Sequence, residues 1–125
     1  MEVKSKEDFD RLKVLPFFKG VIVSDSMSPL IKTGDSIVVE VGTEDIRRFD
    51  IIVFWNESEK KLTCHYLWAI NRFFTPVLYQ TRSIRYGFRD HPISRAEYLG
   101  KVVSHRLSQW QKLRILFAYF MGGKS

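Results

Sequence analysis

The sequence has one cysteine and no long apolar run. Cys64 is alone among the 125 residues, so no internal disulfide can form and a reducing compartment is allowed. Residues 1–8 contain no apolar stretch of the kind found in a secretory signal, and no window approaches the roughly 20 apolar residues that cross a bilayer. We therefore expect a cytoplasmic protein that is at most peripherally attached to a membrane.

Potential metal ligands are also few. Cys64 and His65 are adjacent, but the pair is too small a ligand set for structural zinc, which is held tetrahedrally. Neighbouring side chains of a strand point to opposite faces, so we expect Cys64 to pack in the interior while His65 faces a site. Neither a metal nor a cofactor is expected.

Acidic residues are scarce in the second half of the chain. Residues 1–65 contain 10 Lys and Arg against 12 Asp and Glu, whereas residues 66–125 contain 10 against 2. A basic block of this kind can meet an acidic peptide, an anionic membrane surface or nucleic acid, or it can be a solvated face with no dedicated partner. Three of its arginines are candidate contacts to a substrate or an anion: Arg82, Arg85 and Arg89.

Short runs of β-branched and aromatic residues predict a mainly β chain. The predicted strands lie near residues 21–23, 36–41, 51–55, 62–70, 77–81 and 98–104. Their spacing indicates a single, partly closed antiparallel β domain with its core over residues 17–105. Before it, the capping-box pattern from Ser5 to Asp8 predicts a short helix from Lys6 to Val14 that ends before Pro16.

Residues 107–121 have the pattern of a second helix. Its apolar stripe contains Leu113, Leu116, Phe117 and Phe120, with Trp110 and Met121 beside it. Such a helix either docks on its own sheet or lies on a membrane surface, because basic and aromatic-apolar faces suit the lipid interface. No helix-turn-helix is expected, since only about 20 residues precede the predicted strand at residues 21–23. Nucleic acid is not expected as a partner.

A serine-bearing turn separates the first two predicted strands. Residues 24–29 read Ser-Asp-Ser-Met-Ser-Pro, and Gly34-Asp35 follows them. A strand that ends in such a turn displays Ser26 at the rim of a sheet, which suits a nucleophile that has a base within hydrogen-bond reach. The same residue types are ordinary loop formers, so the residues alone leave both interpretations open.

The pattern Ser-x-Ser-Met-x-Pro, then Gly-Asp and a β-rich run, resembles the nucleophile box of type I signal peptidases and of the related LexA-type self-cleaving repressors. In that clan a lysine or a histidine on a later strand activates the serine. Here His65 follows Ser26 by 39 positions, which is similar to the ER and archaeal branch of signal peptidases. Residues 89–93 and 99–103 are similar to that branch's Asp-x-Pro and Gly-Lys-Val blocks.

The resemblance implies a signal-peptidase-type domain and a serine endopeptidase that cuts a peptide or protein substrate. Ser26 would be the nucleophile, His65 the general base and Asp90 the residue that orients the histidine. The oxyanion donors would be the Ser26 backbone N–H and the Ser24 hydroxyl. A free-standing repressor-type self-cleaving domain is disfavoured, because the residues before the nucleophile strand are too few for a helix-turn-helix.

Further residues of the resembling motif have structural roles. Met27 and Pro29 would shape the turn, Gly34 would supply a tight turn before the next strand, and Asp35 completes the motif. Lys61 is the rival base, because it shares the face of His65 if the strand extends that far. A lysine at a strand's start beside acidic residues is also simply a solvated hairpin residue.

The sequence departs from the family pattern at three places. Tyr66 stands where arginine is usual after the histidine, residues 81–84 replace a Thr-Lys-Gly-Asp block, and Phe49 stands where a second Gly-Asp has its glycine. The membrane spans that anchor signal peptidases are also lacking. These departures motivate an alternative: a catalytically silent or weakly active binding module whose basic second half engages a peptide, a membrane surface or nucleic acid.

Overall fold

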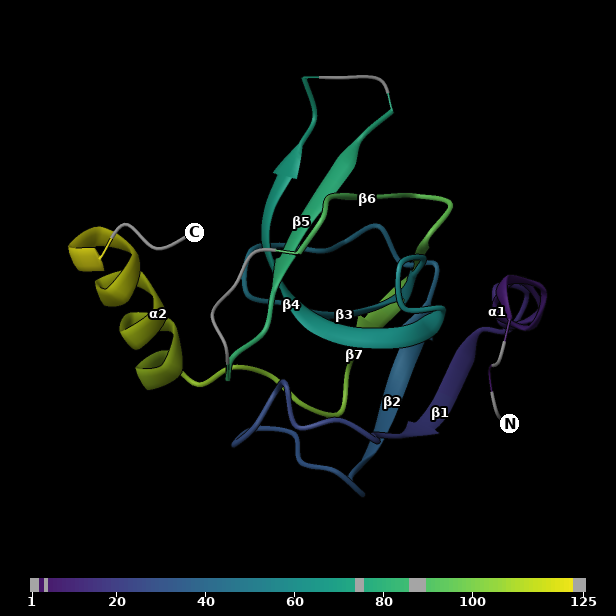
Figure 1. The fold of residues 1–125 in the computed structure, drawn as a ribbon, viewed down its shortest axis with the longest axis horizontal. Helices are drawn as coiled ribbons and strands as arrows, with labels where there is room; N and C mark the ends of the chain where they lie inside the picture. Colours follow the sequence, from purple (N-terminus) through teal and green to yellow (C-terminus); the bar gives the residue numbers. More distant parts are fainter. Residues whose placement is uncertain (1–2, 4, 74–75, 86–89, 123–125) are drawn as a thin grey trace.

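The computed structural model describes the chain except for residues 1–2, 4, 74–75, 86–89 and 123–125 (Figure 1). Within the described residues, seven antiparallel strands form one sheet in the order β1-β2-β7-β3-β4-β5-β6. The elements are α1 Lys6–Leu12, β1 Phe17–Val21, β2 Ser36–Val41, β3 Ile51–Asn56, β4 Lys61–Asn71, β5 Leu78–Arg82, β6 Ile93–Ser94, β7 Tyr98–Val102 and α2 Gln109–Gly122.

The prediction of a mainly β chain with a helix at each end is confirmed. The sheet is open rather than partly closed, with β1 and β6 as its edges. The first strand covers Phe17–Val21 instead of residues 21–23, because this segment is the one that pairs with β2. The short strand β6, which pairs with β5, lies between the predicted strands at residues 77–81 and 98–104.

Strand β3 is buried on both faces of the sheet. Ile51, Val53 and Trp55 belong to one hydrophobic cluster, and Ile52 and Phe54 belong to a second. The alternation follows from the two-residue period of a strand, and it explains why this strand is a continuous apolar run. Helix α1 covers the first cluster, to which its buried residues Phe9 and Leu12 belong.

The two helices lie at opposite ends of the molecule (Figure 1). Helix α1 begins as predicted, with the Ser5 Oγ accepting a hydrogen bond from the Asp8 N–H, and it ends two residues before Val14. Helix α2 packs on the sheet through the Tyr119 ring, whose centroid lies 5.0 Å from that of Trp68. Within the described residues, neither helix has the length and apolar character needed to cross a bilayer.

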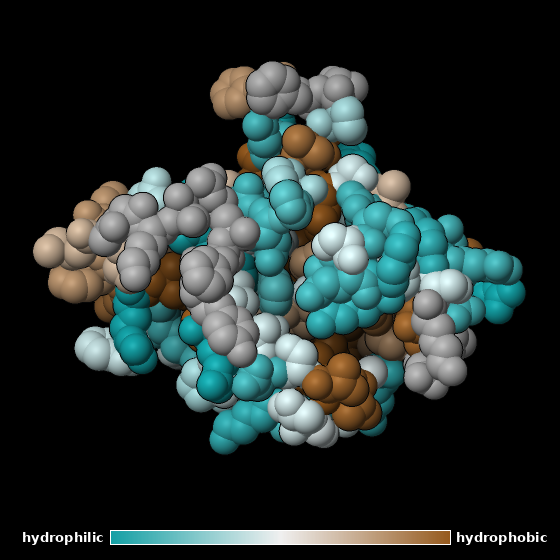
Figure 2. Space-filling model, in the orientation of Figure 1, coloured by the Kyte–Doolittle hydropathy of each residue, from teal (hydrophilic) through white to brown (hydrophobic). Residues whose placement is uncertain are grey.

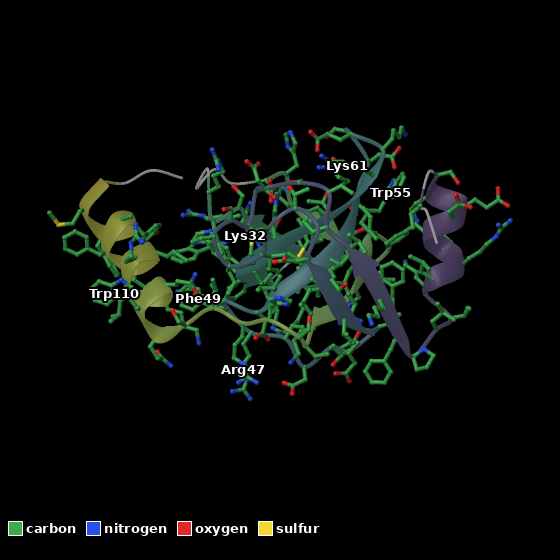
Figure 3. The ribbon with its side chains drawn as sticks, turned by 90° about the horizontal axis from the view of Figure 1, so that it is seen from below. Lys32, Arg47, Phe49, Trp55, Lys61 and Trp110 are labelled. Atoms are coloured by element: carbon green, nitrogen blue, oxygen red, sulfur yellow. The ribbon has the colours of Figure 1, made fainter. Side chains whose placement is uncertain are left out.

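Phe49 has a backbone conformation that usually favours glycine, with φ of 78°. Its N–H donates to the Leu67 carbonyl at 2.7 Å, and its ring lies 6.3 Å from that of Tyr66 and 6.1 Å from that of Trp68, between centroids. A phenylalanine therefore adopts a left-handed backbone conformation at the position where the motif that the sequence resembles has glycine. Its ring adds aromatic packing between the sheet and α2 (Figure 3).

Candidate active site

Ser26, His65 and Asp90 come together from three separate parts of the chain. The Ser26 Oγ lies 3.1 Å from His65 Nε2, and His65 Nδ1 lies 2.5 Å from Asp90 Oδ2. Ser26 belongs to the turn after β1, His65 to the middle of β4, and Asp90 to the segment between β5 and β6. With the Nδ1–H tautomer, the serine hydroxyl donates to Nε2 and the imidazole donates to the carboxylate, which is the arrangement of a serine nucleophile with an oriented base.

Strand β4 fixes the position of the histidine. His65 pairs with Ile52 of β3, and the pairing of β4 with β5 begins at the next residue, Tyr66. Only 8% of the surface of His65 is exposed, and its ring packs edge-on against Phe54 at 5.9 Å between centroids. The neighbouring Cys64 packs against the opposite cluster, as the alternation of a strand predicts.

Two residues of β5 hold Asp90. The Thr81 hydroxyl donates to Asp90 Oδ2 at 2.6 Å, and the Thr81 carbonyl accepts from the Asp90 N–H at 3.0 Å. The side-chain amide of Gln80 donates to the Asp90 carbonyl oxygen at 2.6 Å. Sequence reasoning missed both residues. The only available signal was the position of Thr81 at the start of a block that departs from the family pattern.

The two candidate oxyanion donors lie in the turn that contains the nucleophile. The Ser24 Oγ accepts from the Ser26 N–H at 3.2 Å and donates to the Ser26 Oγ at 3.2 Å. The hydroxyl donors thus run from Ser24 to Ser26 and on to His65. In this state the Ser26 N–H and the Ser24 hydroxyl both donate within the turn. A substrate carbonyl oxygen therefore has to replace the acceptors of these two hydrogen bonds.

Arg85 ties this turn to the segment after β5. Its backbone N–H donates to the Ser26 carbonyl at 2.9 Å, and its guanidinium lies 3.2 Å from the Asp25 carboxylate. Met27, the residue after the nucleophile, is buried in the hydrophobic core and so anchors the turn to the core. The two contacts of Arg85 place it next to the candidate site. The sequence predicts it only as a candidate contact to a substrate or an anion.

The remaining motif residues close the loop that carries the nucleophile. Gly34 has φ of 96° and its N–H donates to the Ile22 carbonyl at 2.8 Å, so the expected tight turn is present. Asp35 accepts from the Lys32 N–H at 2.8 Å through its carboxylate. Pro29 follows a cis peptide bond in the same loop.

A cleft of about 1380 Å³ opens over the three candidate residues. Its walls are residues 18–27, the β3–β4 hairpin and residues 90–93, and its lining includes Ser26, His65 and Asp90. Val21 and Val23 are largely exposed on one wall. The cleft therefore combines apolar walls with a polar cluster at one place, which is typical of a ligand site.

Lys61 does not take the place of the base. It lies at the start of β4 near the β3–β4 hairpin, where its Nζ is 3.3 Å from a Glu59 carboxylate oxygen (Figure 3). Lys60 forms an ion pair with Glu57 in the same hairpin. Both lysines are exposed, in agreement with the interpretation of solvated hairpin residues.

Arg82, a candidate contact to a substrate or an anion, is buried beside aromatic rings. Only 4% of its surface is exposed, and its guanidinium lies over the Trp68 ring at 4.6 Å and the Tyr119 ring at 5.7 Å. It pairs across the strands with Tyr66 and hydrogen-bonds that side chain. Two of the departures from the family pattern, Tyr66 and Arg82, are therefore partners of each other. Arg89 lies outside the described residues.

Burial affects the titration of two groups on β4. It raises the pKa of the Cys64 thiol to about 12, so the thiol stays protonated at neutral pH and is a poor nucleophile. It also raises the pKa of Tyr66, against the opposing effect of the Arg82 guanidinium. Among the described residues, no group of three or more His, Cys, Asp or Glu side chains could hold a metal ion.

Comparison with known proteins adds no family to this geometry. No protein-family model, no curated protein and no solved structure matches the chain. The likeness to signal peptidases therefore rests on the motifs of the sequence, and the candidate site rests on its own distances and contacts.

Proposed function

We propose that the chain is a serine endopeptidase of signal-peptidase-like type, with Ser26 as nucleophile, His65 as general base and Asp90 as its orienting carboxylate. The observation that carries this proposal is the continuous hydrogen-bonded series from the Ser26 Oγ through both ring nitrogens of His65 to Asp90, at 3.1 and 2.5 Å. A series of this kind activates a serine hydroxyl for attack on a carbonyl.

The first half of the reaction forms an acyl-enzyme. As the Ser26 Oγ attacks the carbonyl carbon, His65 Nε2 takes the hydroxyl proton and Asp90 stabilises the imidazolium. The carbonyl oxygen becomes an oxyanion, which the Ser26 N–H and the Ser24 hydroxyl receive after they part from each other. The imidazolium then gives its proton to the leaving amine, and the peptide C–N bond breaks.

The second half restores the free enzyme. His65 takes a proton from a water molecule as that water attacks the acyl carbon, and it returns the proton to the Ser26 Oγ when the ester breaks. The products are a new carboxylate and a new amine. Every proton moves between Ser26, His65, water and the substrate.

The shape of the cleft supports a peptide as substrate. Strand β1 is an edge of the sheet, and the segment that continues from it towards Ser26 lines the cleft. An extended peptide can add to such an edge through backbone hydrogen bonds while its side chains meet apolar walls. The alternative of a binding module that uses the basic second half has less support, because Arg82 is buried and Arg85 is paired with Asp25.

The experiment is a digestion of a degenerate peptide library, read by mass spectrometry, with four proteins: wild type, Ser26→Ala, His65→Ala and Ser28→Ala. Ser28 lies in the same turn but outside the hydrogen-bonded series, so its variant is the matched control. We expect wild type and Ser28→Ala to cut the same bonds, and the other two variants to lose at least about a thousandfold in rate. Equal cleavage by Ser26→Ala would overturn the proposal.

A further inference from the structure

Helix α2 presents apolar side chains on two opposite faces. On one face, Ile115 and Leu116 are half-buried against the core, and the Tyr119 ring stacks near Trp68. On the other face, five large apolar side chains are between 57% and 77% exposed: Trp110, Leu113, Phe117, Phe120 and Met121. We call these five residues the outer face of α2. The predicted stripe is thus divided, with Leu116 turned inward and the rest turned to solvent.

The spacing of the outer face makes it continuous along the helix. Its members follow one another at intervals of three, four, three and one residues, which keeps them on one side of a helix with 3.6 residues per turn. Apolar side chains gather over α2 at the edge of the molecule (Figure 2). Trp110 lies on α2, whereas Phe49 lies between α2 and the sheet (Figure 3). An exposed patch of this kind marks an interaction surface.

The charges beside the outer face identify its partner. Helix α2 contains no acidic residue, and the last acid of the chain is Glu97. Of its two cations, Lys112 lies on the inner side, with its Nζ 5.9 Å from the centroid of the Phe49 ring. Arg114 is four residues after Trp110, so it lies beside the outer face on the helix surface. Arg106, just before α2, is also exposed. A symmetric pairing of two copies through the outer face would bring Arg114 of each copy close together with no acidic residue on α2 to balance them, whereas anionic phosphate headgroups would neutralise Arg114 and Arg106.

We propose that the outer face of α2 binds the surface of an anionic phospholipid bilayer. The helix lies parallel to the surface, with its aromatic side chains among the headgroups and upper acyl chains, at a depth of about 5–10 Å. Its 14 residues are about 21 Å long, which is shorter than the roughly 30 Å of a hydrocarbon core, so it does not cross the bilayer. This attachment is independent of the proposed peptidase chemistry.

The test uses the full chain and sedimentation with phospholipid vesicles. One set contains equal parts of phosphatidylcholine and phosphatidylglycerol, and the other contains phosphatidylcholine alone. We expect binding to the first set, weaker binding to the second, and a loss of binding to the first set as salt is added. Phe117→Ser should weaken binding at least about tenfold, because the side chain no longer enters the apolar layer. Arg114→Glu should remove the preference for phosphatidylglycerol.

A matched control comes from the other end of the molecule. Phe17, the first residue of β1, is 57% exposed, and β1 begins five residues after the end of α1, so Phe17→Ser removes an exposed ring of the same kind without touching α2. This variant should bind the vesicles as wild type does. Both serine variants should unfold at the wild-type temperature, since each removed ring is exposed. Ser26→Ala should also bind as wild type does, which separates this inference from the proposed activity.

Tryptophan fluorescence reports the depth of the contact. Of the three tryptophans, Trp55 and Trp68 are buried, whereas Trp110 is 69% exposed. Brominated acyl chains should therefore quench Trp110, and Trp110→Phe should remove that quenching. The proposal is overturned if folded wild type binds neither vesicle set, if Phe17→Ser weakens binding as much as Phe117→Ser, or if the outer face instead pairs two copies. The last result would appear as a dimer that Phe117→Ser dissociates while no lipid binds.

Discussion

Asp90→Asn isolates the contribution of the carboxylate charge to serine activation. Asp90 Oδ2 accepts hydrogen bonds from both His65 Nδ1 and the Thr81 hydroxyl. An asparagine at this position turns its side-chain oxygen towards these two donors. The opposite orientation would place its NH2 hydrogens against the hydrogens of both donors. The tautomer and orientation of His65 are therefore retained, and only the negative charge is lost.

The size of the effect follows from the attraction between the carboxylate and the imidazolium. At about 4 Å and an effective dielectric constant near 20, two unit charges attract by about 4 kcal/mol. The side chain of Asp90 is 24% exposed and that of His65 is 11% exposed, so water screens part of this attraction. A loss of about 2–4 kcal/mol remains, and it corresponds to a rate lower by a factor of about 30–1000.

The assay is the second-order rate of Ser26 phosphonylation by a fluorophosphonate, followed by intact-protein mass at several pH values. Asp10→Asn makes the same chemical change at an exposed position on α1 and should react at the wild-type rate. A rate for Asp90→Asn within twofold of wild type, with the protein folded, would show that His65 does not depend on the carboxylate. The reasoning from the geometry of the site would then be refuted.

Three further predictions concern the site and the fold. Thr81→Val removes the hydroxyl that donates to Asp90 Oδ2 and should slow phosphonylation by about ten- to a hundredfold, the value of a hydrogen bond to a charged group. Gly100→Ala places a Cβ 2.2 Å from the Glu40 carbonyl oxygen, so urea unfolding should show a loss of about 3 kcal/mol or more. The free energy of unfolding should fall as pH rises from about 9 towards about 12, because the unfolded Cys64 thiol ionises near 9.0 while the folded thiol stays protonated. The free energy of unfolding of Cys64→Ala should fall less steeply over the same pH range.

Each of these predictions has its own control. Thr81→Ser keeps the hydroxyl and should restore most of the phosphonylation rate. Gly34→Ala adds a Cβ that meets nothing within 4 Å, so its cost should come only from the positive φ and stay near 1 kcal/mol, about a third of that at Gly100. If the free energy of unfolding had the same pH dependence in wild type and in Cys64→Ala, ionisation of the Cys64 thiol would not be the cause of the loss.

The serine and the histidine were accessible from sequence because the motif and the strand pattern locate them. Ser26 stands in a turn between apolar runs, and His65 stands in a run whose alternation separates it from Cys64. Asp90 could be singled out because acidic residues are so few in this half of the chain. That it contacts His65 depends on how the segment after β5 folds back, which no local pattern specifies.

The supporting contacts required the register of the sheet. Thr81 and Gln80 meet Asp90 because the segment after β5 returns along that strand, and this return leaves no periodic signal. Arg82 looked like part of a basic patch, but its place opposite Tyr66 and beneath α2 buries it. Charge counts do not distinguish a solvated arginine from one that stacks on aromatic rings.

The most direct test of the central claim is to label the folded protein with a fluorophosphonate and locate the adduct by peptide mapping. The account predicts one adduct on wild type, placed on Ser26, no adduct on Ser26→Ala, and a much slower reaction of His65→Ala. An adduct on another residue, equal labelling of Ser26→Ala, or no reaction of correctly folded wild type would contradict the claim that Ser26 is an activated nucleophile.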